Sequence, residues 1–247
     1  MLRSMETLLG YHLDAKDDRL GRCKDFLFDD RDWVVRYMVA DTHRWLPGGR
    51  NVLISPISLG IPHEEEKAIP VKLNVDQIKD SPPLEENRPI SREYELRLFQ
   101  YYGYGFYWMG NGLWGTHPHP GPLVDTQALD EQEGRTEERE YHLRSASEID
   151  GYSIRALDDN LGHVDDILVD DVSWQIQYLV INTRNWLPGG KRIVVPRQAV
   201  AELSWPQQLV KIDRTEDQIK AGIEYEPDRL ADPNYEARLE QASRKAA

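Results

Sequence analysis

Short apolar segments separated by polar turns run along the chain, and one arrangement of them occurs twice. Residues 33–42 (WVVRYMVADT) and 174–183 (WQIQYLVINT) are rich in β-branched and aromatic side chains, which predicts a central strand in each place. Leu-Pro-Gly-Gly follows both, at 46–49 and 187–190, and leads into NVLI or RIVV. Proline presets the first corner of a turn and glycine tolerates positive φ, so each phrase predicts a hairpin turn. A glycine pair can also cradle phosphate, but no Gly-rich loop leads into a helix here.

Further short strands are predicted before each central strand. Gly-Tyr, at 10–11 and 151–152, opens one of them, and the segments 23–28 (CKDFLF) and 164–169 (VDDILV) predict another. Asp-Asp-x-Leu-Gly lies between the two in both places, and its residues favour a turn. Each half of the chain therefore predicts a β-rich fold.

Helices are predicted after these strands. Asn-x-x-Gln at 74–77 and Thr-x-x-Gln at 215–218 have the spacing of a capping box in front of an isoleucine. A second helix is predicted to begin at Ser91 (SREYELRLFQYY) and, in the other half, at Asp-Pro 232–233. The order of elements is thus the same in both halves.

The two halves are related in sequence as well as in pattern. At a fixed offset of 141 positions, residues 2–59 and 143–200 are identical at 23 of 58 positions without a gap. A residue kept in both copies is expected to serve the fold, and a function of one copy is expected where the copies differ. The shared residues include Leu2-Arg3-Ser4, Asp25, Trp33, Tyr37 and Thr42, which recur as Leu143-Arg144-Ser145, Asp166, Trp174, Tyr178 and Thr183.

These motifs resemble the PRC-barrel family. The resemblance rests on the Gly-Tyr opening strand, the LGxxxDxLxD segment, the Tyr-x-Val strand and the Pro-closed hairpin ending in VLISP or IVVP. It covers most of 2–80 and 143–222 and is closest to tandem bacterial members. The matching segments are Gly21–Asp29, Tyr37–Val39, Val52–Pro56, Gly162–Asp170, Tyr178–Val180 and Ile193–Pro196.

The resemblance implies two small, partly open six-stranded β-barrels and a mainly β fold class. The predicted domains are a first barrel repeat at 1–80, a helix with an aromatic, Gly-rich segment and an acidic linker at 81–142, a second repeat at 143–222, and a helical tail at 223–247. Family members include the cytoplasmic domain of the photosynthetic reaction centre H subunit and the C-terminal domain of a ribosome-maturation factor. The family mainly holds other proteins and shares no catalytic residues, so the resemblance implies no enzyme and no cofactor.

Composition narrows the function classes. The chain of 247 residues has a formal net charge of -13, which argues against binding to a nucleic-acid backbone. No stretch approaches the roughly 20 apolar residues of a membrane span, and the start lacks the apolar core of a signal peptide. A single cysteine, Cys23, excludes an internal disulfide and fits a reducing compartment. A cytoplasmic location without an integral membrane segment is therefore expected.

Few residues suggest chemistry. Paired aspartates, such as 17–18 and 158–159, could gather Ca²⁺, but they lie where turns are predicted and lack a calcium-loop spacing. Asp25 and its counterpart Asp166 lie within strands and either face solvent or are buried with a hydrogen-bond partner; a structural role is favoured because both copies keep them. Cys23 is predicted to be a small buried hydrophobe, because Val164 takes its place in the second copy.

His117 and His119 form the one histidine cluster, and they are weak zinc candidates because no paired Cys or acidic residue stands at ligand spacing. No metal, cofactor or catalytic residue is therefore predicted.

The segment 101–116 (YYGYGFYWMGNGLWGT) has no counterpart in the second copy. Its rings either fold back to close the core or form an exposed patch that anchors a partner or a second subunit. After it, a Pro-rich and then acidic stretch is interpreted as a solvated linker. The predicted partner-binding residues are Tyr102, Tyr104, Phe106, Tyr107, Trp108 and Trp114.

Three functions are consistent with these features. The first is a non-enzymatic protein-interaction or assembly module, with a homodimer as a natural extension of the duplication. The second is a peripheral subunit or assembly factor of a membrane complex like that of the H subunit. The third is a small-ligand-binding protein, which would need a pocket with convergent polar groups that differ between the copies.

Overall fold

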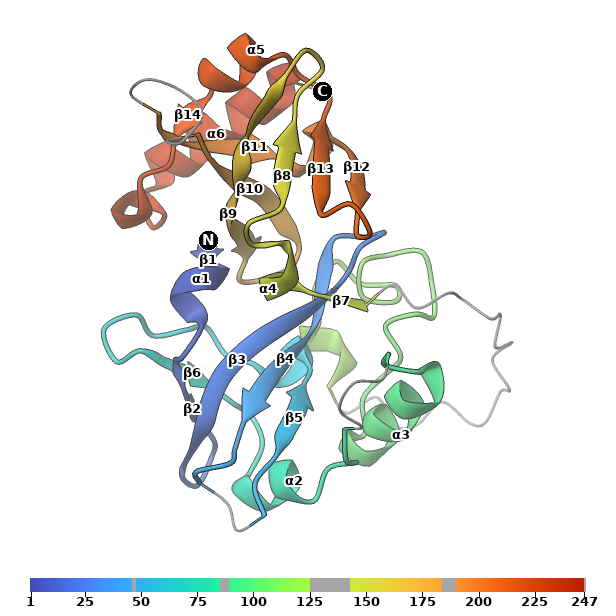
Figure 1. Cartoon of the computed structure of the whole chain (residues 1–247). Coiled ribbons are helices and arrows are strands. Elements are labelled where there is room, and N and C mark those ends of the chain that lie inside the picture. Colours follow the sequence, from blue (N-terminus) through green and yellow to red (C-terminus); the bar gives the residue numbers. More distant parts are fainter. Residues whose placement is uncertain (46–47, 85–88, 125–142, 184–189, 247) are drawn as a thin grey trace. The chain divides into compact units, whose positions relative to one another are not determined.

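The computed structural model describes residues 1–45, 48–84, 89–124, 143–183 and 190–246, and it is mainly β (Figure 1). The chain divides into two compact units, neither of which is a continuous stretch of sequence. Unit 1 comprises Met1–Thr7, Ala146–Asp170 and Ile176–Ala247, and unit 2 comprises Leu8–Ser145 and Asp171–Gln175. The predicted mainly β fold class with short helices is confirmed, and the strands form two sheets.

Unit 1 contains an eight-stranded sheet with the order β12-β13-β8-β9-β10-β11-β14, in which β1 also pairs with β9. Pairing is antiparallel throughout except between β13 and β8. Its strands are β1 Leu2–Ser4, β8 Ser153–Arg155, β9 Asn160–Asp170, β10 Ile176–Asn182, β11 Arg192–Pro196, β12 Val200–Ser204, β13 Leu209–Ile212 and β14 Ile223–Glu224. Its helices are α4 Ala146–Ile149, η3 Arg197–Ala199, α5 Glu216–Lys220, η4 Pro227–Arg229 and α6 Pro233–Ala246.

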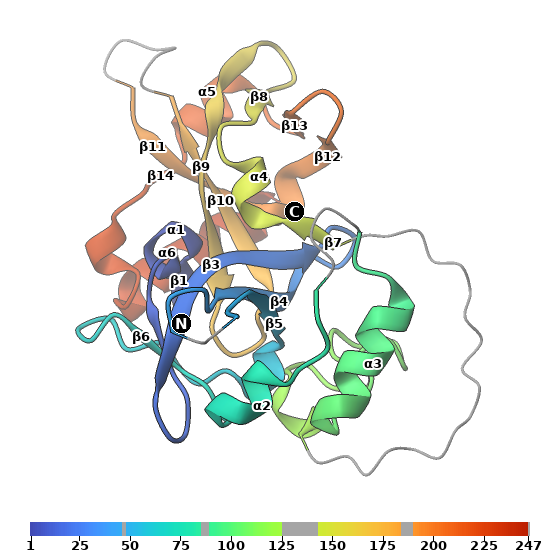
Figure 2. The same ribbon diagram turned by 60° about the horizontal axis from the view of Figure 1, so that its bottom comes forward.

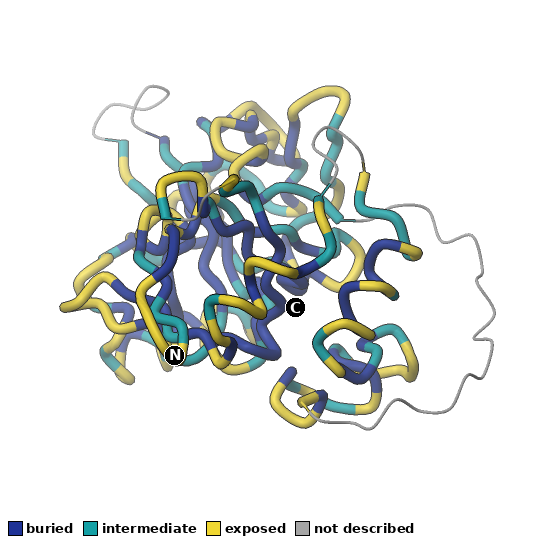
Figure 3. Tube along the Cα trace, turned by 90° about the horizontal axis from the view of Figure 1, so that it is seen from below, coloured by how far each residue is buried: buried dark blue, intermediate teal, exposed yellow. Residues whose placement is uncertain are grey.

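Unit 2 contains a six-stranded sheet with the order β5-β4-β3-β2-β6, in which β7 also pairs with β3. In the described residues neither sheet closes on itself. Apolar residues of both sheets are buried, and Figure 3 marks the buried residues in dark blue. The strands are β2 His12–Asp14, β3 Arg19–Asp29, β4 Val34–Asp41, β5 Asn51–Ile54, β6 Ala68–Pro70 and β7 Leu143–Ser145. The helices are η1 Pro56–Ser58, α2 Val75–Lys79, α3 Arg92–Tyr102 and η2 Gly121–Leu123; α1, Met5–Leu8, spans the boundary between the units.

The predicted helix starts are confirmed. Ser91 caps α3 by accepting a hydrogen bond from the Tyr94 backbone N–H at 3.1 Å. The Thr215 box is complete at α5, and the Gln77 side chain accepts from the Asn74 backbone N–H at 2.9 Å at α2. Each of these helices begins where a side chain satisfies an amide that has no partner within the helix.

Both predicted hairpins exist, but their loops are longer than a tight turn. β4 ends at Asp41 and β5 begins at Asn51, and Gly48 has the expected positive φ of 70°. The loop is closed by Thr42, whose hydroxyl donates to the Arg50 carbonyl at 2.7 Å and accepts from the Arg50 N–H at 3.1 Å. Thr183, kept in the second copy, closes β10–β11 in the same way. Residues 46–47 and 184–189 lie outside the described residues.

The Leu-Arg-Ser triplets are exchanged between the copies. β1 begins the first copy but pairs with β9 of the second, and β7 begins the second copy but pairs with β3 of the first. The two registers are equivalent, with Ser4 opposite Leu168 and Ser145 opposite Leu27. This exchange is one reason why the compact units depart from the predicted ranges 1–80 and 143–222. In addition, Asp171–Gln175, between β9 and β10, belongs to unit 2, so the chain crosses between the units four times.

A serine–aspartate hydrogen bond holds each exchanged strand. The Ser145 hydroxyl donates to the Asp25 carboxylate at 2.5 Å. The buried carboxylate of Asp166 accepts from the Glu6 backbone N–H at 3.1 Å and is hydrogen-bonded by Ser4, its counterpart donor. The structural role expected for both aspartates is therefore confirmed: each fixes the short strand that its sheet receives from the other copy.

Replacing Ser145 with alanine should destabilise the protein by about 1–3 kcal/mol, because Asp25 then loses a charge-assisted donor. Urea unfolding of wild type and Ser145→Ala measures the difference. Ser153→Ala, an exposed serine of β8, is the control and should change the free energy of unfolding by less than about 0.5 kcal/mol. Equal effects of the two substitutions would contradict the anchoring role of Ser145.

Candidate interaction site in the aromatic segment

The segment that has no counterpart in the second copy, residues 101–116, begins at the end of α3, the longest helix of unit 2 (Figure 2). The helix ends at Gly103, which has a φ of 71° and allows the chain to reverse. The following residues return along the helix, and the Gly105 N–H donates to the Leu123 carbonyl at 3.0 Å. The described part of the segment therefore forms one folded element with α3.

Phe99 is the apolar centre of this element. It is fully buried, and five aromatic rings lie with their centroids within 5.2–6.3 Å of its own. Such edge and tilted contacts add to the area that each ring buries. The five rings belong to Tyr37, Tyr104, Phe106, Tyr107 and Trp108.

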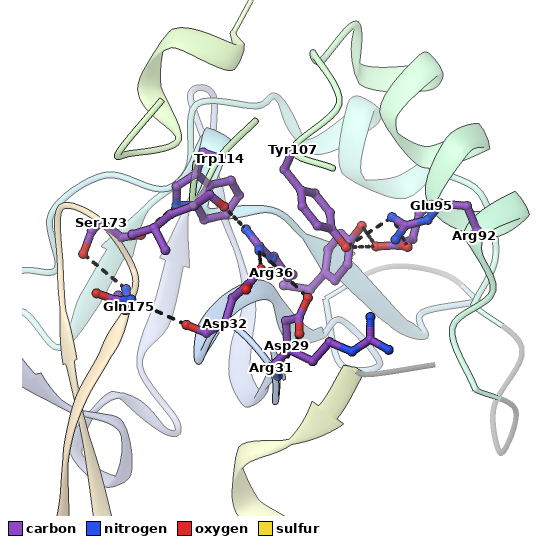
Figure 4. Close-up of polar contacts among 12 residues, drawn as sticks. Asp29, Arg31, Asp32, Arg36, Arg92, Glu95, Tyr107, Trp114, Ser173 and Gln175 are labelled. Atoms are coloured by element: carbon purple, nitrogen blue, oxygen red, sulfur yellow. Dashed lines mark hydrogen bonds and ion pairs between the residues drawn. The ribbon is translucent and has the colours of Figure 1, made fainter. Parts of the chain in front are cut away.

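Glu95, on the buried side of α3, is the polar centre. Its Oε1 accepts a hydrogen bond from the hydroxyl of Tyr37 and another from the hydroxyl of Tyr107, each at 2.7 Å. Its Oε2 forms an ion pair at 2.8 Å with Arg92, one turn earlier on the helix (Figure 4). One carboxylate thus links the helix, the central strand β4 and the aromatic segment.

Arg36 joins the same cluster from β4. Its side chain is 2% exposed. The guanidinium lies 4.1 Å from the centre of the Tyr107 ring and 5.0 Å from the centre of the Trp114 ring (Figure 4). It also donates a hydrogen bond to the Leu113 carbonyl. The charge is balanced by Asp32, at 3.1 Å. A buried cation held between two rings and a carboxylate fixes the segment against the sheet.

Burial sets the ionisation of this cluster. It raises the pKa of the Glu95 carboxyl above its usual 4.5, although Arg92 and the two tyrosine hydroxyls act in the opposite direction. Burial, followed by the charge of Glu95, raises the pKa of both the Tyr37 and the Tyr107 hydroxyl. The tyrosines therefore remain protonated donors at neutral pH.

Trp114 binds a short piece of the second copy that belongs to unit 2. Its indole Nε1–H donates to the Ser173 carbonyl at 2.7 Å. Next to it, the Val35 N–H donates to the Trp174 carbonyl at 2.8 Å, and the Trp174 ring lies 6.0 Å from that of Phe26. The turn between β9 and β10 is therefore part of the same packed region.

The structure divides the six predicted partner-binding residues into two groups. Tyr104, Tyr107 and Trp114 are buried and belong to the interior of unit 2, so these three rings close the core. Tyr102, Phe106 and Trp108 are half-buried. Partner binding by this set stays a prediction, and the second group supplies the rings that can take part in it.

Phe106 and Trp108 form a stacked pair, with ring centroids 4.9 Å apart and an interplanar angle of 25°. The Arg92 guanidinium lies 4.2 Å from the centre of the Trp108 ring. Met109, the next residue, is 41% exposed. A rigid aromatic pair with an adjacent cation and a flexible apolar side chain is typical of a protein-binding surface.

The remaining candidate residues have structural positions. His117 and His119 are both half-buried, and His117 exchanges two backbone hydrogen bonds with Trp114. Among the described residues, no group of three or more His, Cys, Asp or Glu side chains could hold a metal ion. Cys23 is buried, as predicted, and burial raises the pKa of its thiol. Asp17, one of the paired aspartates predicted to lie in turns, accepts a hydrogen bond from the Val75 backbone N–H at 2.9 Å.

Sequence reasoning did not identify Arg36 and Glu95. Arg36 lies in a strand at a position where Gln177 stands in the second copy, and that difference is the signal that could have singled it out. Glu95 was one of several charged residues on a predicted helix. Their pairing depends on how α3 packs on the sheet, which periodicity does not determine.

Replacing Arg36 with glutamine, the residue of the second copy, should destabilise the protein by about 3 kcal/mol, because the Leu113 carbonyl and two ring faces lose a buried cation. Urea unfolding followed by tryptophan fluorescence measures this loss. Arg31→Gln, on the neighbouring turn and exposed, should have little effect. Similar unfolding midpoints for the two variants would rule out an anchoring role for Arg36.

The raised pKa of Glu95 predicts that its contribution to stability falls as pH rises. The unfolded carboxyl loses its proton near pH 4.5, whereas the folded one keeps it to higher pH, so deprotonation between these values favours unfolding. The free energy of unfolding of wild type relative to Glu95→Gln should therefore decrease from pH 4 upward. The pKa of Asp166 is also raised, but Asp166 is present in both proteins, so its effect cancels in the difference between their free energies of unfolding. Parallel stability curves for the two proteins would contradict the prediction.

Comparison with known proteins finds a family match in the second half of the chain. No helix in the described residues is both long and apolar enough to span a membrane. No curated protein matches the chain. Residues 142–219 match the family model of the PRC-barrel domain, whereas the resemblance of residues 2–80 to that family lies outside the match and stays a prediction. The chain therefore contains a PRC-barrel domain at residues 142–219.

Proposed function

We propose that this chain is a non-enzymatic protein-interaction module, whose partner binds at the Phe106–Trp108 pair. The main support is that the stacked pair belongs to a segment found in one copy alone. A buried cluster, in which Tyr107 contacts Glu95 and Arg36, holds this segment in place. The shared residues of the duplication build the two sheets. The difference between the copies therefore supports a function in the inserted segment.

The rigidity of the Phe106–Trp108 pair favours binding. A flexible aromatic loop would lose conformational entropy on binding, whereas side chains already held in one arrangement lose little. Phe106 and Trp108 contact the buried Phe99, and Trp108 also stacks on Arg92, which is ion-paired to Glu95. The buried cluster therefore supports a preformed binding surface.

We also propose that the first copy is a second PRC-barrel domain and that the protein acts in the cytoplasm. Two features support the second domain. β2–β3–β4–β5 follow one another as β8–β9–β10–β11 do, and β3 and β9 each contain 11 residues. The free, buried Cys23 is the single cysteine of the chain, and the sparing use of cysteine supports a reducing compartment.

The test compares two tryptophans that are both half-buried and both in contact with an aromatic ring. Trp108→Ser removes the proposed anchor, whereas Trp205→Ser removes a ring that lies 5.8 Å from Tyr152 in unit 1. Each full-length protein is used as bait in extracts of the cells that express it, and captured proteins are quantified by mass spectrometry. Trp108→Ser should reduce capture of the partner by about tenfold or more, and Trp205→Ser should not. Equal capture by both variants would refute the proposal.

A further inference from the structure

The exchanged triplets define two matching strand-acceptor sites. β3 receives β7 with Asp29 opposite Leu143, and β9 receives β1 with Asp170 opposite Leu2. The donor triplets have identical sequences, and the pairings have the same register. Either acceptor therefore recognises the same short strand, Leu-Arg-Ser, by the same backbone ladder.

The side-chain anchors match as well. Ser145 donates to Asp25 in unit 2, and Ser4 is hydrogen-bonded to Asp166 in unit 1. Leu2 is 3% exposed and packs in the buried cluster that includes Tyr235. The serine is thus a polar recognition element in both triplets, and Leu2 adds a buried apolar contact in unit 1, whereas β7 is half-buried along its length. None of these contacts depends on which chain supplies the strand.

We propose that a second copy of this chain can supply these strands, giving a domain-swapped dimer. In the dimer, β7 of each chain pairs with β3 of the other, and β1 of each pairs with β9 of the other. Every hydrogen bond within a unit is kept, so the dimer and the monomer differ in free energy by the cost of association and by the connection across residues 125–142.

Mass action sets the expected population. Covalent linkage of the two copies gives an effective concentration of about millimolar, so intrachain pairing dominates in dilute solution. Refolding at about 0.1 mM chain should therefore place on the order of a tenth of the molecules in the swapped dimer. Once formed, the dimer exchanges subunits slowly, because both short strands must leave their sheets first.

Two isotopic forms of the wild-type full chain test the proposal. Unlabelled and ¹⁵N-labelled protein are unfolded together in urea, refolded at about 0.1 mM and analysed by native mass spectrometry. A mixed dimer should form on joint refolding and should not form when the two proteins are folded separately and then mixed. Absence of any dimer, or mixed dimers that appear on mixing folded proteins, would overturn the proposal; the second result would indicate association through another surface.

Complementary variants give an independent measurement. Ser145→Pro disables the donor strand of one chain, and Asp25→Lys disables the acceptor of the other. When the two variants are refolded together, the amount of mixed dimer should be at least fivefold greater than the amount of dimer that either variant forms alone. The reason is that an intact β3–β7 pairing can form only between the acceptor of Ser145→Pro and the donor of Asp25→Lys. A statistical mixture of dimers would count against strand exchange. Trp108→Ser should swap as wild type does, so the outcome is separable from that of the proposed function.

Discussion

Two strands of three residues are too short to be stable alone, and each is held by an edge that the other copy provides. The hydroxyl of Ser145 reaches the carboxylate of Asp25, and Ser4 is bound in the same way at Asp166. With the turn Asp171–Gln175, which belongs to unit 2, this constraint explains why each compact unit contains sequence from both copies. It also gives a physical reason for residues that the duplication has kept.

Unit 2 also contains a cluster of buried charged side chains. Arg36 enters the interior because α3 and the aromatic segment provide two rings, a backbone carbonyl and a nearby carboxylate to receive its charge. Glu95 is satisfied from three sides by Arg92 and the hydroxyls of two tyrosines. Buried charges cost free energy unless every partner is present, so the cluster forms only with the segment in one arrangement. That requirement links the interior of the unit to the stacked rings at its surface.

Local features were predictable from the sequence, whereas non-local pairings were not. The cap at Ser91 and the strand around Tyr37 follow from spacing and side-chain type, and both are present. The exchange could not be predicted because Leu-Arg-Ser pairs in an equivalent register with β3 and with β9, and the sequence alone does not determine which of the two strands it joins. The identical triplets at positions 2–4 and 143–145 can be seen in the sequence, but their structural role depends on which strand each of them pairs with.

The reciprocal exchange is most directly tested by cutting the chain between its copies. A protease site introduced within residues 125–142 of the full-length protein would give an N-terminal and a C-terminal fragment after cleavage of the folded protein. The exchange predicts that the fragments stay together as a one-to-one complex in size-exclusion chromatography with light scattering, because each completes a sheet of the other. Two folded fragments that separate without denaturant would contradict it.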